Sequence, residues 1–394
     1  MTIMMQFLSK LKNAIVNIGA SNFHNLKSWF QNEAWKEMNP YHLICPVLFQ
    51  IDPEKAHKLT IKLLSYRLIP RINNNIDEIL HTNICGISFP NPVGLAAGFD
   101  KNSEVIAEIL NLGFGFTEIG SITPRPQPGN PTPRVFRLVA SQAVINRYGF
   151  NSEGLDVNEC RLAAWHSKHS SASSRGIVGI NLGKNKDSED AVADYIEGLD
   201  RLSPYADYIA INISSPNTQG LRHLQQRDLL AHLLHKIMEK KQSLKNKPPL
   251  FVKIAPDQTD KELEDIAEVT LTSGIDGLIV GNTTVSRPPS VPADVAKEAG
   301  GLSGKPLFKM STDTLRQIYK LTNGKLPLIG CGGIFTAEDA YEKILAGASL
   351  VQIYTGMVYE GPFIAHSISR GLAKLLRRDG FTSIREAVGI RGCS

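Results

Sequence analysis

One short stretch of this 394-residue chain concentrates side chains with catalytic potential. Residues 212–218 (Asn-Ile-Ser-Ser-Pro-Asn-Thr) place amides and hydroxyls directly behind the apolar run at 208–211. That run is typical of a strand, and Pro216 cannot donate to a sheet, so the strand is predicted to end at about Ser214 with Ser215 at its rim. Amides suit a planar heterocycle that carries N–H and C=O groups, and a hydroxyl can accept or pass a proton. A turn that merely closes the strand would use the same residue types.

The pattern of an apolar run ended by polar or small residues occurs at eight places in the chain. The runs are at 91–98, 116–121, 177–181, 208–213, 250–254, 277–282, 328–333 and 350–355. Between most of them, apolar residues recur at helical spacings of three and four, at 105–112, 190–202, 229–242, 260–273, 308–321 and 337–346. Strands that alternate with helices pair in parallel, and short strands this apolar are buried on both faces. The pattern therefore favours an α/β fold, a (β/α)8 TIM barrel, over an open doubly wound sheet, with functional residues at the carboxyl ends of the strands.

Two lysines stand at these predicted strand ends. Lys253 lies inside the apolar run 250–254, where a lysine must point into a site or pair with another charge. A structural ion pair is the alternative explanation for Lys253. Lys101 follows Ala97 and Gly98, and small residues there would let a flat ring approach the backbone.

Small-residue loops follow the last predicted strands, the usual phosphate position in such barrels. They are at 300–304, 330–333 and 354–356. A tight turn would explain each loop alone, but three together indicate a phosphate group. Phosphate, lysine, room for a flat ring and many asparagines together describe a flavin mononucleotide (FMN) site with a planar amide substrate above it.

Composition and charge set wider limits. With 42% hydrophobic and 21% charged residues, the chain can bury a full core without disulfide support. The five cysteines are odd in number and far apart, which is typical of a reducing compartment, and neither cysteines nor histidines have metal-ligand spacing, so no metal site is predicted. The net charge of +5, with no aromatic-basic patch, favours a membrane surface over nucleic acid.

The region before the barrel divides into two predicted parts. Residues 1–37 form a basic amphipathic extension that is either a flexible, membrane-surface segment or a targeting peptide. Residues 38–72 form a helical hairpin, whose second helix begins with Asp52 as N-cap and Pro53 at the first helical position. The barrel domain then covers 73–394. On the second helix, the predicted outer positions are His57, Lys58, Lys62 and Arg67, and those available to a lipid-like surface are Leu59, Ile61, Leu63 and Leu64.

Four long segments carry a specific resemblance. They read NPVGLAAGFDK at 91–101, INRYGFNS at 145–152, NISSPNT at 212–218 and GGLSGKP at 300–306. In this order they closely resemble the motifs of class 2, quinone-dependent dihydroorotate dehydrogenases, and the similarity runs from about Asn39 to Arg391.

The resemblance implies oxidation of (S)-dihydroorotate to orotate in de novo pyrimidine (UMP) biosynthesis. Ser215 matches the family's catalytic base, which takes the C5 proton while hydride leaves C6 for N5 of FMN. A serine at this position points to the membrane-associated class, because the soluble class uses a cysteine. Thr218 and Phe150 match positions along the relay that carries the proton away.

The resemblance also assigns the ligand contacts. The residues that match FMN contacts are Ala97, Gly98, Lys101, Ser121, Asn181, Asn212, Lys253, Ser303, Gly304, Gly333, Tyr354 and Thr355. Those that match substrate contacts are Lys101, Asn146, Arg147, Tyr148, Gly149, Phe150, Asn151, Asn212, Asn217, Asn282 and Thr283.

By the same resemblance, the hairpin forms an apolar tunnel through which a ubiquinone-type quinone reoxidises the flavin. His57, Arg137 and Tyr354 match polar positions at the inner end of that tunnel. We therefore expect peripheral attachment to the cytoplasmic side of a bacterial inner membrane, with the mitochondrial inner membrane as the alternative, and a monomer or weak homo-oligomer.

Two other classes of protein would share part of this pattern. A Schiff-base aldolase also places a lysine at the end of a barrel strand and a phosphate site on the last strands, but it does not need the Ser215 motif or the asparagines. A catalytically inert barrel that only tethers to membranes would not need them either. Bound flavin absorbs visible light, so colour separates both from the flavoenzyme.

Overall fold

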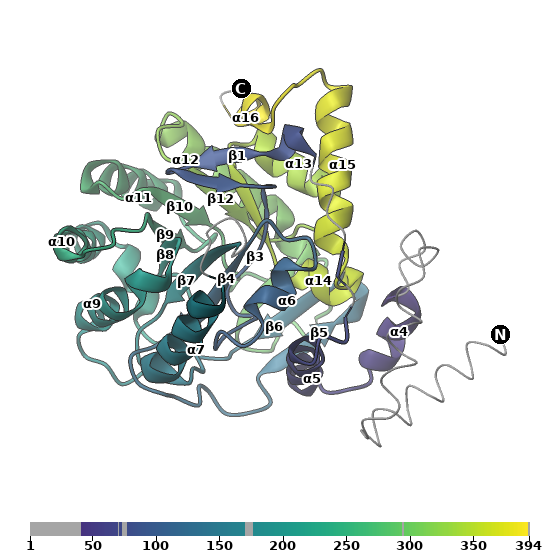
Figure 1. Cartoon of the computed structure of the whole chain (residues 1–394), viewed down its shortest axis with the longest axis horizontal. Helices are drawn as coiled ribbons and strands as arrows, with labels where there is room; N and C mark the ends of the chain where they lie inside the picture. Colours follow the sequence, from purple (N-terminus) through teal and green to yellow (C-terminus); the bar gives the residue numbers. More distant parts are fainter. Residues whose placement is uncertain (1–40, 70, 73–76, 170–175, 294, 393–394) are drawn as a thin grey trace.

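The computed structural model describes residues 41–392 except 70, 73–76, 170–175 and 294 (Figure 1). The basic extension predicted at residues 1–37 lies outside the described residues. Within the described ranges, no helix is both long and apolar enough to cross a membrane.

Eight parallel strands close into a barrel in the spatial order β10-β12-β13-β3-β4-β7-β8-β9 (Figure 1). In chain order they are β3 Val93–Leu95, β4 Phe116–Ile122, β7 Ile177–Leu182, β8 Tyr208–Asn212, β9 Leu250–Ile254, β10 Gly277–Val280, β12 Leu328–Cys331 and β13 Leu350–Ile353. Each overlaps one of the eight predicted apolar runs, which confirms the predicted TIM barrel. β8 ends at Asn212, two residues before the predicted end, because the Ser214 amide donates to the Asn212 side chain (3.3 Å).

Helices surround the barrel. They are α6 Ile106–Leu110, α7 Gly154–Lys168, α9 Ala191–Leu202, α10 Arg227–Ser243, α11 Asp260–Ser273, α12 Phe308–Leu321, α13 Ala337–Leu345, α14 Thr355–Glu360, α15 Ile364–Arg378 and α16 Ile384–Ala387. The starts of α11 and α13 are fixed by capping boxes, in which Thr259 and Thr336 exchange hydrogen bonds with Glu262 and Asp339. All six predicted helical segments are confirmed.

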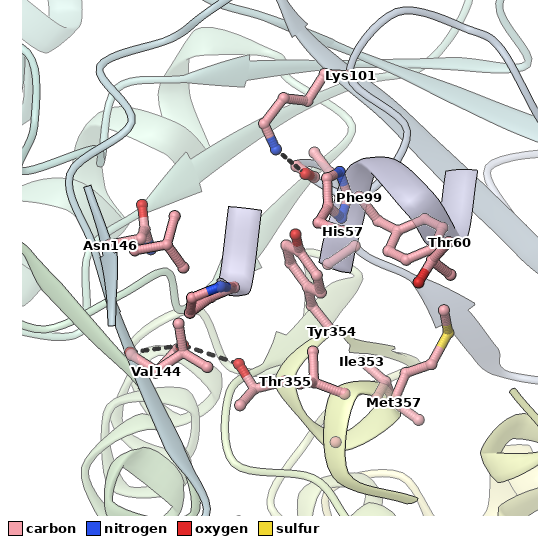
Figure 2. A pocket seen from close by; sticks show the side chains of 18 of the residues that line it. His57, Thr60, Phe99, Lys101, Val144, Asn146, Ile353, Tyr354, Thr355 and Met357 are labelled. Carbon is pink, nitrogen blue, oxygen red and sulfur yellow. Dashed lines mark hydrogen bonds between the residues drawn. The ribbon is translucent and has the colours of Figure 1, made fainter. Parts of the chain in front are cut away.

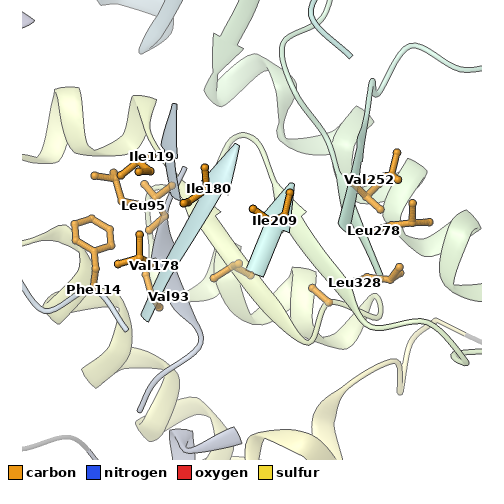
Figure 3. Packing of buried hydrophobic residues seen from close by; sticks show 14 of the residues in the cluster. Val93, Leu95, Phe114, Ile119, Val178, Ile180, Ile209, Val252, Leu278 and Leu328 are labelled. Atoms are coloured by element: carbon orange, nitrogen blue, oxygen red, sulfur yellow. The ribbon is translucent and has the colours of Figure 1, made fainter. Parts of the chain in front are cut away.

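Strand side chains alternate between the barrel interior and the surrounding helices. The outward ones, such as Val178, Ile180 and Ile209, are fully buried (Figure 3). Burial of each such aliphatic side chain stabilises the fold by roughly 1.5–3 kcal/mol. This alternation matters for function, because it also decides which polar residues point inward.

Aromatic rings fill the amino-terminal end of the barrel interior. The Tyr208 ring lies 5.4 Å from Phe251 and 6.2 Å from Phe116, measured between centroids. Glycine makes room for them: a Cβ on Gly179 would lie 2.0 Å from the Tyr208 ring. This end is covered by the antiparallel hairpin β1 Thr82–Ile84 and β2 Ile87–Phe89, so the lower interior is a packed core.

A second antiparallel sheet lies outside the barrel, in the order β11-β6-β5. Its strands are β5 Val135–Leu138, β6 Ala143–Asn146 and β11 Gly301–Gly304. The segment 300–304, predicted as a loop on the last barrel strands, is therefore largely a strand of this sheet. Glycine is required at Gly304 (φ +101°), because an added Cβ would lie 2.3 Å from the carbonyl oxygen of Gln142, the residue just before the neighbouring strand β6.

In the part of the chain that the structure describes, two α-helices precede the barrel, α4 Tyr41–Leu48 and α5 Pro53–Ser65, beside α14 and β5 respectively (Figure 1). Asp52 caps α5 as predicted, accepting from the Lys55 amide (2.9 Å). A buried two-point ion pair fastens α5 to the barrel domain: Arg134 donates to both Glu54 carboxylate oxygens, at 2.8 and 2.9 Å. This contact lowers the pKa of Glu54 to about 2.

The predicted faces of α5 are partly wrong. Lys58, Lys62 and Arg67 are exposed as expected. Ile61 and Leu64, however, are buried in the main core, and His57 faces inward instead of outward. Residues 57, 61 and 64 are spaced by four and three, so they form a single stripe, and this stripe is the one that packs on the barrel.

Candidate active site

A cavity of about 880 Å³ opens at the carboxyl ends of the barrel strands and continues under α4 and α5 (Figure 2). Strand ends and their loops line one part, and the two N-terminal helices line the other. Among the described residues, no group of His, Cys, Asp and Glu side chains is placed to hold a metal ion.

Lys253 enters the cavity from β9 because of strand alternation: Val252 and Ile254 point outward, so Lys253 points inward. Its Nζ lies 3.9 Å from a Glu118 carboxylate oxygen, so the ion pair considered above is present but long. Glu118 is engaged elsewhere: it accepts from Gln352 (2.6 Å), Asn181 (2.7 Å) and the Tyr208 hydroxyl (2.9 Å). Among the described residues, the Lys253 ammonium therefore faces the cavity with no carboxylate closer than this 3.9 Å contact.

Lys101 is the second buried cation of the cavity. Its ammonium donates to the Gly98 carbonyl and lies 4.4 Å above the centre of the Tyr148 ring. Burial lowers the pKa of Lys101 to about 8. Gly98 (φ +102°) lines the cavity beside it, and a side chain there would crowd the wall, since an added Cβ would lie 3.3 Å from the Tyr354 ring and 3.9 Å from the Lys101 Nζ.

Ser215 lies on the loop after β8 and is 8% exposed. Its Oγ accepts from the Asn217 amide (3.3 Å), which leaves the hydroxyl hydrogen available. Arg222 braces this loop by donating to the Ser214 carbonyl (2.9 Å) and the Thr283 carbonyl (2.8 Å). The hydroxyl of Thr218, three residues on, is buried and has no hydrogen-bond partner within the described structure.

Interlocking amides surround Ser215. Asn212 donates to Ser121 (3.0 Å), Asn282 donates to Ser214 (2.7 Å), and Asn217 donates to the Asn146 carbonyl (3.1 Å). We call this part of the cavity the amide chamber, formed by Ser215 and the side chains of Asn146, Asn151, Asn212, Asn217 and Asn282. These bonds fix the amides in place, so the chamber presents a preset array of donors and acceptors.

Two polar atoms at the chamber lack partners. Asn151 Oδ1 and Thr283 Oγ1 are buried and make no hydrogen bond to any described residue. Buried polar groups are normally paired, so this deficit is what a site prepared for a polar ligand would show.

Small residues and hydroxyls line the far side of the cavity. The Thr355 hydroxyl donates to Ser303 (2.8 Å), which donates to the Val144 carbonyl (3.1 Å; Figure 2). Gly304 and Gly333 lie beside them in the cavity wall. Their exposed backbone and hydroxyl groups could hold an anionic group such as a phosphate.

The part of the cavity under the N-terminal helices is apolar. We call it the apolar arm; it is lined by Leu48, Ala56, Leu59, Leu63, Leu68 and Ile69. Three polar side chains stand at the cavity wall nearby: His57, Arg137 and Tyr354. The His57 ring meets the Phe99 ring edge-on, with 5.3 Å between the ring centres (Figure 2). Burial lowers the pKa of His57 to about 3, so the imidazole is neutral. Arg137 stacks on Phe49 and donates to its carbonyl (3.0 Å).

The structure gathers nearly all predicted site residues around this one cavity. Asn181 does not line it but lies beneath, bonded to Ser121, Asn212 and Glu118. The side chain of Arg147 points away instead: it pairs with Glu298 (2.8 Å) and stacks on Phe136.

Sequence reasoning missed several residues around the site. Glu118 stands in the apolar run of β4, which is the same signal that singled out Lys253. The ion pair of Glu54 with Arg134 joins residues 80 positions apart, and nothing local in the sequence indicates it. Phe99 and Met357 line the cavity, but both are residue types that are common in protein cores, so the sequence does not distinguish them.

Comparisons with known proteins agree with this geometry. The sequence profile of the dihydroorotate dehydrogenase family matches residues 79–376. The chain is 51% identical over 384 residues to the mitochondrial dihydroorotate dehydrogenase (quinone) of Arabidopsis thaliana, an alignment that covers 92% of this chain and 82% of that protein. It is 50% identical over 356 residues to the dihydroorotate dehydrogenase (quinone) of Azorhizobium caulinodans, covering 89% and 99% of the two chains.

A solved structure is also similar. The ligand-free DHODH from Eimeria tenella superposes with a TM-score of 0.84 at 45% sequence identity, covering 86% of this chain and 99% of that one. This chain therefore belongs to the dihydroorotate dehydrogenase family and is an oxidoreductase.

Proposed function

We propose that this chain oxidises (S)-dihydroorotate to orotate, with FMN as its cofactor and a membrane quinone as the final electron acceptor. One observation carries the proposal: a single cavity joins the amide chamber around Ser215 to the apolar arm under α4 and α5. A polar, planar substrate and a long apolar acceptor can thus use the same cofactor from different directions.

The residues present fit FMN. The cavity wall at Ala97 and Gly98 carries almost no side chain, which suits the close approach of a flat ring, and Lys253 would supply positive charge to that ring. Ser303, Gly304, Gly333 and Thr355 can hold its phosphate. The chemistry that FMN would supply there is reversible two-electron transfer, as hydride acceptor for the substrate and electron donor for the quinone. The remaining predicted FMN contacts are Ala97, Lys101, Ser121, Asn181, Asn212 and Tyr354.

Ser215 is the proposed base that removes the C5 proton of dihydroorotate. A serine hydroxyl is a weak base unless its own proton is passed on. The neighbouring Thr218 hydroxyl, buried and without a partner among the described residues, is a suitable next acceptor in such a relay. Burial of Ser215 also keeps bulk water from the reacting atoms.

Substrate binding falls to the amide chamber and Lys101. Fixed amides can pair with the N–H and C=O groups of the ring, and the orphaned atoms of Asn151 and Thr283 gain partners when it binds. Lys101 supplies the positive charge for the substrate carboxylate. Tyr148, Gly149 and Phe150 complete the wall. The Arg147 side chain points away from the cavity and pairs with Glu298, so Arg147 is not among the proposed substrate contacts.

The apolar arm is the proposed quinone site. Its aliphatic walls suit the tail, and His57, Arg137 and Tyr354 offer polar contacts for the quinone carbonyls. Lys62 and Tyr66 line the cavity while remaining exposed, so a basic and an aromatic side chain lie where the cavity meets solvent. Such side chains suit peripheral attachment to a membrane surface, at the cytoplasmic side of a bacterial inner membrane or, alternatively, at the mitochondrial inner membrane.

The test is an anaerobic visible spectrum of the purified full chain. We expect a yellow protein that dihydroorotate bleaches and that a ubiquinone analogue restores. A yellow protein that dihydroorotate fails to bleach would refute the substrate, and a colourless protein that takes up no added flavin would refute the cofactor.

A further inference from the structure

Lys343 on α13 is a lysine with no exposed surface, outside the cavity described above. Its Nζ donates to Ser311 Oγ (2.8 Å) and Thr312 Oγ1 (2.9 Å), both on α12, and lies 5.1 Å from the centre of the Phe308 ring. No carboxylate in the described part of the chain forms an ion pair with it. A buried ammonium without a counter-ion is costly to keep charged, so its presence calls for an explanation.

The charged groups around Lys343 are occupied elsewhere. On α13, Asp339 caps its own helix through the amides of Phe335 and Thr336. On α12, Asp313 pairs with Lys309 and Arg316. From β12, the neighbouring group is the Cys331 thiol, whose pKa burial raises. Burial lowers the pKa of Lys343 itself to about 7.

A short path leads from Lys343 to the cavity. Ser311 accepts from Lys343, and its one hydroxyl hydrogen is shared between the carbonyl oxygens of Gly332 and Phe308, each at 3.1 Å. Gly332 and Gly333 line the cavity beside Thr355, on the side assigned above to the phosphate. The Lys343 side chain packs against β12, because a Cβ added to Gly330 on that strand would lie 3.1 Å from Lys343 Cδ. Lys343 thus stands two hydrogen bonds behind the glycine pair.

We propose that Lys343 is a positioning residue for the cofactor phosphate. Through Ser311 it holds the Gly332–Gly333 turn, and a bound phosphate dianion balances its buried positive charge. This inference rests on the proposed function. The competing explanation is that Lys343 only ties α13 to α12, in which case its loss affects the fold without regard to phosphate.

The proposal has a definite pH dependence. A phosphate dianion favours the charged lysine, so the pKa of Lys343 rises when the cofactor binds. The phosphate-dependent part of the affinity is therefore complete below the free pKa of about 7 and is lost as the pH rises through the higher, bound value. A phosphomonoester is already largely dianionic above about pH 7, so its own titration does not produce this loss.

The experiment compares FMN with riboflavin, which lacks the phosphate, in the full chain loaded with either flavin. Dilution of the loaded protein releases flavin, and its fluorescence gives the dissociation constant. We expect Lys343→Met to weaken FMN by roughly tenfold or more and riboflavin by less than about threefold, and Ser311→Ala to weaken FMN in the same selective way.

The matched control is Lys241→Met. Lys241, on α10, is also a buried lysine, at 8% exposure, but it pairs with Asp276 (2.5 Å), the residue before β10, and it does not line the cavity. The Lys241→Met substitution should leave the ratio of FMN affinity to riboflavin affinity unchanged.

Equal weakening of both flavins by Lys343→Met, or the same selectivity in Lys241→Met, would overturn the inference. If Lys343→Met does not fold, the wild-type chain decides: its FMN-to-riboflavin affinity ratio should fall between about pH 7.5 and 9.5, and a constant ratio would overturn the inference. A wild-type chain that binds neither flavin would instead overturn the proposed function, and this inference with it.

Discussion

The amide chamber and the apolar arm lie in one cavity but are built in opposite ways. In the chamber, polar side chains from barrel strands and their loops hold one another, as where Asn282 donates to Ser214 and Asn212 donates to Ser121. In the arm, aliphatic side chains from two helices outside the barrel form the walls, and polar groups stand at His57, Arg137 and Tyr354. The chamber is thus suited to fix a small polar ring, and the arm to admit a flexible apolar molecule.

This difference separates the effects that substitutions should have. A change in the chamber should alter the reduction of the cofactor, and a change in the arm should alter its reoxidation. The buried ion pair of Glu54 with Arg134 fastens α5 to the barrel domain, so the two parts keep a fixed relation.

The largest effect is expected for Ser215→Ala. Loss of a positioned general base typically slows a reaction by roughly 10²–10⁴-fold, so cofactor reduction by dihydroorotate should slow within that range. Flavin content should stay at the wild-type level, because Ser215 is not among the proposed FMN contacts. Stopped-flow absorbance under anaerobic conditions measures both. Reduction at the wild-type rate would remove Ser215 from the role of base.

A smaller effect is expected for Ala56→Trp, which places a bulky ring in the apolar arm. We expect kcat/KM for a long-chain quinone to fall roughly ten- to hundredfold, because the arm can no longer admit the tail. Steady-state assays with long-chain and short-chain quinones measure it. Lys55→Trp is the matched control, since Lys55 is exposed on the same helix and does not line the cavity. Equal losses in both variants would mean that the arm is not the quinone site.

The smallest effect concerns pH. Burial lowers the pKa of Lys101 to about 8, and an anionic ligand favours the charged amine. Orotate affinity should therefore be complete below about pH 8 and fall at higher pH, by at most about tenfold per pH unit. Titration of the flavin spectrum with orotate measures this. The same titration of Lys101→Met separates the lysine from ionisation of orotate itself: a pH dependence that persists in this variant would contradict the assignment.

The sequence made the chamber predictable because its polar residues interrupt apolar strands. Lys253 and Asn212 are conspicuous there, and strand alternation then requires them to point inward. Glu118 carries the same signal and could have been found by the same argument. Arg147 belongs to the same motif as Asn146 and Asn151, but side chains around the end of β6 point in different directions, and a motif does not show which of them face the cavity.

The arm was less predictable for a physical reason. Its walls consist of leucine, isoleucine and alanine, the residues that also form the core, so composition does not separate a tunnel from a packed interface. Helical spacing identifies the stripes of α5 but not which stripe faces the barrel, and His57 was therefore expected on the outer face. The family resemblance, rather than the pattern, is what predicts His57 at a quinone site.

The central claim is that one cofactor is reduced from the chamber and reoxidised from the arm. Its most direct test is sequential anaerobic mixing, first with dihydroorotate and then with a long-chain quinone, in the wild-type, Ser215→Ala and Ala56→Trp proteins. We expect a crossed result: Ser215→Ala slows bleaching and leaves recovery unchanged, and Ala56→Trp slows recovery and leaves bleaching unchanged. If both variants slowed the same half-reaction, the division of the cavity into two functional parts would be wrong.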